Sequence, residues 1–260
     1  MPRKLVIVDA GVVTLWAYAG LLLIAEFITA RNLKTGMIVH GCILVVLLFH
    51  STIVENRYFS NLYASLSLIP LIRVMSLCIP LMHFEYILWF LIVGVPLFAA
   101  IFTCIYIQHL DLWSVGLKIP SRKDIPLTCG IILLGIPVGW VEYYILEPEF
   151  MISARASWIA PILILIICTG CLEELLFRGL LQHTFTEAIG IQGVFIISVI
   201  FGLLHLGNSW LDCVLAGDIG LIYALVVRKT GSIYGTSISH GVINIMLFLV
   251  MPYLALHPPA

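Results

Sequence analysis

The sequence is poor in charge. Only 10% of its 260 residues are Asp, Glu, Lys or Arg, and the formal net charge is −1. A soluble globular domain carries about 25% charged residues, so this composition excludes an ordinary soluble protein. Basic residues do not outnumber acidic ones, which excludes a general nucleic-acid-binding surface. We therefore expect no nucleic acid partner.

Motifs of several hydrolase classes are missing as well. There is no Gly-x-Ser-x-Gly elbow and no evident Cys-His pair, which argues against a serine or cysteine nucleophile. The His-Glu-x-x-His helix of many zinc proteases is also absent. The seven cysteines lie in or beside apolar runs, and we interpret them as buried thiols that behave as small hydrophobic residues.

Long apolar runs are abundant, because 62% of the residues are hydrophobic. A helix that crosses a bilayer needs about 20 such residues. The runs predict nine spans, near residues 12–30, 36–54, 62–82, 86–107, 125–146, 157–187, 191–208, 211–228 and 231–253. Pro70, Arg73 and Pro80 interrupt the third, so the count is eight or nine. We predict an all-α, polytopic transmembrane helix bundle in a cell membrane, with the lipid bilayer as a partner.

The polar connection 108–124 divides this single membrane unit. We assign 1–124 to N-terminal helices with their amphipathic connection and 125–255 to a helical core. Lys and Arg residues accumulate in cytoplasmic connections. Eight of them share the side of the N-terminus (Arg3, Lys4, Arg57, Lys118, Arg122, Lys123, Arg228 and Lys229), and three lie on the other side (Arg31, Lys34 and Arg155). This predicts a cytoplasmic N-terminus.

Three ionisable residues stand out in the first three spans. Glu26 lies near a helix end and His40 near the end of its span, so both are expected to reach the membrane interface. Arg73 lies inside a span and needs a carboxylate or carbonyl partner, because an unpaired charge is costly at that depth.

The densest group of intramembrane charges is Glu173-Glu174-Leu-Leu-Phe-Arg178, in the sixth span. Glu174 and Arg178 have the i,i+4 spacing that places an acid and a base on one helix face. Glu173 points about 100° away and has no partner on its own helix. Burial of such a carboxylate favours a role as general acid or base.

Two further groups contain histidine: Phe201-Gly-Leu-Leu-His205 and His240-Gly-Val-Ile-Asn244. Glu173 and His205 each lie 14 residues from the turn near 187–191, or ~21 Å at a helical rise of 1.5 Å. From the same side, His240 lies ~14 Å and Asn244 ~20 Å deep. We therefore predict that these four residues line one cavity.

Such a cavity could hydrolyse an amide bond. A carboxylate and an imidazole can activate a water molecule, while a second imidazole and an amide donate hydrogen bonds to the oxyanion. One glutamate and two histidines could instead bind a catalytic zinc ion. The residues alone leave this choice open.

The pattern Glu-Glu-x-x-x-Arg, Phe-x-x-x-His and His-x-x-x-Asn, in this order, resembles the CAAX-protease and bacteriocin-processing family of intramembrane glutamate endopeptidases. The resemblance covers roughly residues 155–250, and the first 110 residues add nothing to it. It implies that Glu173 and His205 activate water, and that His240 and Asn244 stabilise the oxyanion. It further implies supporting roles for Glu174 and Arg178. The family has often been described as metalloproteases, but the glutamate mechanism fits these residues without a metal, and we expect no cofactor.

The expected function is hydrolysis of a peptide bond in a membrane-associated peptide or protein, which in this family can be lipidated. One alternative is a non-catalytic scaffold or bacteriocin-immunity protein, and another is a zinc-dependent protease that uses the same residues. A transporter with a polar cavity is a further rival, although the internal repeats typical of transporters are not found in the sequence.

Overall fold

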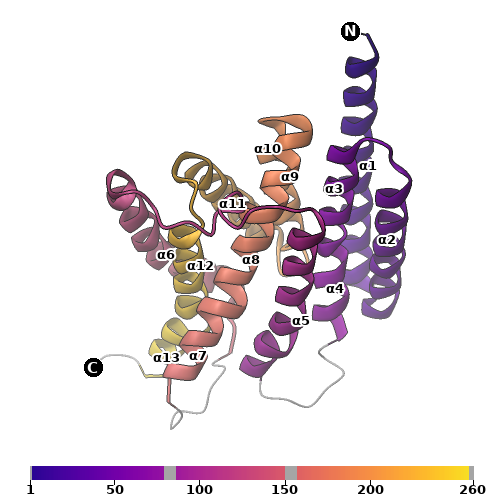
Figure 1. Cartoon of the computed structure of the whole chain (residues 1–260). Coiled ribbons are helices and arrows are strands. Elements are labelled where there is room, and N and C mark those ends of the chain that lie inside the picture. The colour runs from indigo at the N-terminus through magenta and orange to yellow at the C-terminus, as the bar shows by residue number, and fades with distance from the viewer. Residues whose placement is uncertain (1, 79–85, 150–156, 258–260) are drawn as a thin grey trace. The chain divides into compact units, whose positions relative to one another are not determined.

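The computed structural model describes residues 2–78, 86–149 and 157–257. Helices dominate throughout, and the described residues contain no strand. Eight described helices are long and apolar enough to cross a membrane, and the shorter apolar helix Gln192–Leu203 is additional. The predicted all-α bundle with eight or nine spans is confirmed (Figure 1).

The α-helices follow one another as α1 (Pro2–Arg31), α2 (Leu33–Ile53), α3 (Arg57–Leu66), α4 (Leu68–Cys78), α5 (Tyr86–Ile107), α6 (Ile125–Leu146), α7 (Ile159–Ile164), α8 (Leu172–Glu174), α9 (Gln182–Ile189), α10 (Gln192–Leu203), α11 (Trp210–Thr230), α12 (Tyr234–Ile245) and α13 (Met251–Leu256). A 3₁₀ turn, Arg122–Asp124, precedes α6, and three π-helical segments link other helices: Leu165–Cys171, Leu175–Leu181 and Met246–Val250.

Large apolar side chains point outward on many of these helices. Examples are Trp16 and Phe27 on α1, Ile38 and Phe49 on α2, and Val95 on α5, all of which are exposed. Exposed apolar surface on this scale marks contact with another apolar phase. The multi-pass membrane assignment therefore agrees with the structure as well as with the composition.

The chain forms two compact units. One contains Met1–Pro80 and Leu180–Ala224, and the other contains Leu81–Gly179 and Leu225–Ala260. In the first unit, the interrupted third span is divided at Ser67 into α3 and α4, and Asn56 caps the start of α3 by accepting hydrogen bonds from the backbone N–H groups of Tyr58 and Phe59.

The seventh predicted span is shorter than expected. Its helix α10 ends at Leu203, and residues 204–208 form consecutive turns before α11 begins. Ser209 accepts a hydrogen bond from the backbone N–H of Asp212 at 3.0 Å, the pattern of a helix N-cap. A run of Gly, Asn and Ser therefore ends the apolar segment early and starts the next helix.

In the second unit, α12 packs closely against α6 and against the segment Leu165–Cys171. A Cβ atom built on Gly135 of α6 would lie only 2.6 Å from the Ser239 carbonyl oxygen of α12. The Ser239 hydroxyl in turn donates to the Ile131 carbonyl at 2.6 Å. Small residues permit such close helix contact in membranes, where apolar burial drives little association.

The long helix from Ile159 to Ile189 has an unusual pitch at its centre. Two π-helical segments, Leu165–Cys171 and Leu175–Leu181, lie on either side of the short α-helical turn Leu172–Glu174. π-helical turns are rare and occur frequently at functional sites. The paired glutamates therefore lie in a short α-helical turn between two π-helical segments.

Candidate active site

Glu174, Arg178 and His240 form the buried centre of the site. The Arg178 Nη1 group donates to Glu174 Oε1 at 3.1 Å, and Nδ1 of His240 lies 3.2 Å from the same oxygen. Glu174 is fully buried and Arg178 is 3% exposed. The i,i+4 ion pair expected from the sequence is confirmed, and it also holds the histidine ring of another helix.

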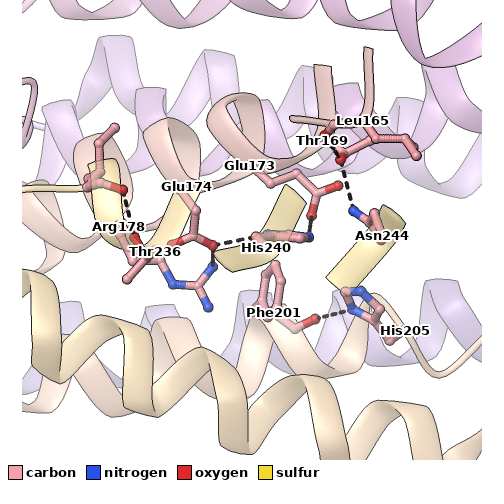
Figure 2. A network of polar contacts seen from close by, with 11 residues as sticks. Leu165, Thr169, Glu173, Glu174, Arg178, Phe201, His205, Thr236, His240 and Asn244 are labelled. Carbon is pink, nitrogen blue, oxygen red and sulfur yellow. Dashed lines mark hydrogen bonds and ion pairs between the residues drawn. The ribbon is translucent and has the colours of Figure 1, made fainter. Parts of the chain in front are cut away.

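Glu173 approaches the opposite edge of that ring. Its Oε2 atom lies 3.9 Å from Nε2 of His240, and a quarter of its side chain is exposed. Figure 2 shows the imidazole between the two neighbouring carboxylates. Adjacent helical residues diverge by about 100°, so a planar ring with a nitrogen on each edge can contact both. Glu173 remains the more accessible acid.

The charge state of Glu174 fixes how His240 is protonated. A carboxylate paired with Arg178 accepts hydrogen bonds but has no proton to donate. The Nδ1 atom of His240 must therefore carry hydrogen when it binds Glu174. The other nitrogen, Nε2, is left to face Glu173 and the accessible part of the site.

Asn244 is held one turn further along the same face of α12. Its amide nitrogen donates to the Thr169 hydroxyl at 2.8 Å, and that hydroxyl donates to the Leu165 carbonyl. This chain of bonds fixes the direction of the amide group. Thr169 was missed in the sequence, although its position four residues before Glu173 places it on the same helix face.

His205 belongs to the first compact unit. Its Nδ1 atom lies 2.9 Å from the Phe201 carbonyl oxygen, so this nitrogen carries a proton and Nε2 is the basic one in the neutral ring. The other five predicted site residues belong to the second unit. The structure thus brings Glu173, Glu174, Arg178 and His240 together, places Asn244 on the same helix as His240, and leaves the meeting of His205 with Glu173 as a prediction.

The residues expected at the membrane interface behave differently from the prediction. Glu26 and His40 are both fully buried, so the expectation that they reach the interface is wrong. The physical reason is Arg73, whose Nε and Nη2 atoms donate to the two Glu26 oxygens at 2.5 and 2.6 Å. The predicted carboxylate partner of Arg73 is therefore present, and it neutralises both charges inside the bundle.

Within the described residues, no group of three or more His, Cys, Asp or Glu side chains is arranged to hold a metal ion.

Comparison with known protein families supports the class that the motifs predicted. Residues 155–246 match the family model described as Rce1-like, type II CAAX prenyl endopeptidase Rce1-like. The matched segment contains all three motifs, and the resemblance to the CAAX-protease family is confirmed. No curated protein and no solved structure matches the chain. The chain is a multi-pass membrane protein, and its segment 155–246 is similar to type II CAAX prenyl endopeptidases.

Proposed function

We propose that the protein is an intramembrane endopeptidase that hydrolyses a peptide bond with a water molecule activated by Glu173 and His205. The observation that carries the proposal is the imidazole of His240 between the two glutamates, one buried and neutralised by Arg178 and the other accessible. Two neighbouring carboxylates in different surroundings can take different chemical roles.

Glu173 is the general base. Its carboxylate accepts a proton from the water molecule while His205 accepts the second hydrogen bond of that water at its free Nε2 atom. The resulting hydroxide attacks the carbonyl carbon and forms a tetrahedral oxyanion. The protonated Glu173 then gives its proton to the leaving amine as the C–N bond breaks. The products are a carboxylic acid and an amine, and the Glu173 carboxylate is regenerated.

His240 and Asn244 stabilise the oxyanion. With Nδ1 bonded to Glu174, the ring can donate through Nε2 only when it is an imidazolium ion. The Glu173 carboxylate beside Nε2 balances that charge before the water loses its proton, and the oxyanion balances it afterwards. The Asn244 amide has a second N–H beyond the one given to Thr169. A single donor of this kind contributes about 10²–10³-fold in rate in a known hydrolase.

The substrate is a peptide or protein at the membrane, because the site lies on membrane-spanning helices. A lipidated substrate fits this setting, since its acyl or prenyl chain would be held in the bilayer beside the enzyme. A soluble peptide would first have to leave water. We therefore propose a membrane-associated substrate, with lipidation as its most favourable form.

Orientation in a cell membrane follows from the basic residues. The backbone N–H of Ile233 donates to the Gly116 carbonyl at 3.0 Å, which joins the connection 108–121 to the turn before α12. Five of the eight residues counted on the cytoplasmic side lie in or beside these two segments: Lys118, Arg122, Lys123, Arg228 and Lys229. This common location supports a cytoplasmic N-terminus. A reporter fused to the N-terminus that is active only outside the cytoplasm should stay inactive, and activity would contradict the orientation.

The function is tested by incubating purified protein in detergent with a panel of membrane-associated peptides, some prenylated and some not. Wild type is compared with Glu173→Ala and His205→Ala, each with and without a strong chelator. Cleavage that both substitutions abolish and the chelator spares supports the proposal. Loss with chelator that zinc restores indicates a metalloprotease. Cleavage that survives Glu173→Ala excludes this base, and a biological role unaffected by both substitutions indicates a scaffold.

A further inference from the structure

The first unit holds a second buried group of charges, outside the segment that matches the family model. Glu26 of α1, His40 of α2 and Arg73 of α4 meet there, and Glu26 Oε1 lies 3.3 Å from His40 Nε2. The Arg73 guanidinium binds both Glu26 oxygens in a fork. Bidentate pairs of this kind fix geometry as well as charge. The group therefore joins three helices at one rigid point.

This ion pair lies beside the loop that carries His205. A Cβ atom built on Gly207 would sit 3.7 Å from Arg73 Nη2 and 3.8 Å from Glu26 Oε2. Those are ordinary contact distances for the added methyl group, so the loop backbone at Gly207 passes close to the paired side chains, with room for one methyl group between them. Gly207 is two residues from His205, and both belong to the run of turns 204–208.

The far end of the loop is held separately. The Asn208 amide donates to Asp212 Oδ2 at 2.8 Å, and the Ser209 hydroxyl caps α11. At the near end, the His205 ring is tied to the Phe201 carbonyl at 2.9 Å. The loop is thus fixed at entry and exit by its own neighbours, while its middle lies close to side chains of helices more than 100 residues away in the sequence.

We propose that the Glu26–Arg73 ion pair is a positioning element for His205, so that the N-terminal helices take part in catalysis through the loop 204–209. Without the pair, the middle of the loop would lose the two fixed side chains beside Gly207, and His205 would sample positions that no longer align the attacking water. A displacement of about 1 Å at such a group can reduce the rate about 10²-fold. The inference rests on the proposed function, because it concerns a residue assigned to water activation.

The choice of variant decides whether the test is informative. Removing one partner would leave an unpaired buried charge and destabilise the protein, whereas removing both charges together is often tolerated. The double variant Glu26→Gln/Arg73→Gln keeps both side chains polar, with the length of residue 26 unchanged and residue 73 shortened. Arg73→Lys keeps the charge but loses the planar fork. Tyr18→Phe is the control, because it removes the 2.8 Å hydrogen bond from α1 to His50 of α2 and leaves the ion pair intact.

The experiment measures kcat, KM, Tm and amide hydrogen exchange on the full chain in detergent. For Glu26→Gln/Arg73→Gln we expect faster exchange confined to 204–209 and a kcat reduced about 10–100-fold with KM unchanged. Arg73→Lys should fall between this variant and wild type, and Tyr18→Phe should match wild type in kcat and in loop exchange.

Three results would overturn the inference. The first is wild-type exchange at 204–209 in the double variant, and the second is faster exchange with a wild-type kcat. A rise in exchange throughout the protein, with a lower Tm, would also reject positioning in favour of general stability. If wild type cleaves no peptide, the failure belongs to the proposed function, and the exchange of 204–209 alone then decides whether the ion pair holds the loop.

Discussion

Replacement of Arg178 by leucine is the perturbation whose size the structure defines best. The guanidinium is 3% exposed and its partner Glu174 is fully buried, with 3.1 Å between Nη1 and Oε1. Arg178→Leu keeps the apolar bulk but leaves a buried carboxylate without its cation. Loss of one partner of a buried ion pair costs about 3–5 kcal/mol, which is a large share of the ~5–15 kcal/mol stability of a typical domain.

In Arg178→Leu, the contact between His240 and Glu174 would remain and could offset part of the lost stability. Its Nδ1 atom lies 3.2 Å from the same Glu174 oxygen, and a protonated ring could supply part of the missing charge. The ring would then be drawn toward Glu174 and away from Glu173. We therefore expect both a destabilisation of at least ~3 kcal/mol and a loss of cleavage, since His240 would no longer present Nε2 correctly.

The assay is reversible unfolding in mixed micelles of increasing denaturing detergent, with Glu174→Gln/Arg178→Leu as the matched control. Removing both charges leaves no unpaired carboxylate, so the double variant should recover much of the stability that Arg178→Leu loses. The reasoning is refuted if Arg178→Leu changes the free energy of unfolding by less than ~0.5 kcal/mol, the range of an ordinary surface substitution.

Three smaller perturbations follow from other contacts. Thr169→Val removes the acceptor of the Asn244 amide and should cost only ~0.6 kcal/mol of stability, the average for a polar contact in a membrane. Because the amide is released, kcat should fall about tenfold, and an unchanged kcat would contradict this. Gly170→Ala places a methyl group against the Ser237 carbonyl and should lower stability by about 1–3 kcal/mol, seen as a reduced Tm. Ser239→Ala should cost ~0.6 kcal/mol and leave cleavage rates intact, so a large loss of activity would show that this hydroxyl does more than join two helices.

Spacing along one helix was sufficient to predict the centre of the site. The i,i+4 rule identified the Glu174–Arg178 pair. Helical rise predicted one cavity for Glu173 and His240 but placed them ~21 and ~14 Å deep, whereas the structure brings them within 3.9 Å. Both predictions use only distances along helix axes. The meeting of His205 with Glu173 depends on the same argument and is still a prediction.

Contacts that depend on rotation about helix axes were not predictable. The Asn244–Thr169 bond requires a particular facing of α12 and a π-helical segment, and π-helical turns leave no reliable mark in sequence. The Glu26–Arg73 pair joins residues 47 positions apart. Hydropathy shows that each charge needs a partner, but it does not show which one, and for this reason Glu26 was wrongly expected at the interface.

The central claim is that the Glu173 carboxylate activates the attacking water. Its most direct test is single-turnover cleavage by wild type and by Glu173→Gln, an isosteric change that removes the base and keeps the size of the side chain. The account predicts a cleavage rate at least about 10²-fold lower, with an unchanged Tm and unchanged substrate affinity. A Glu173→Gln protein that cleaves within about threefold of the wild-type rate would contradict it.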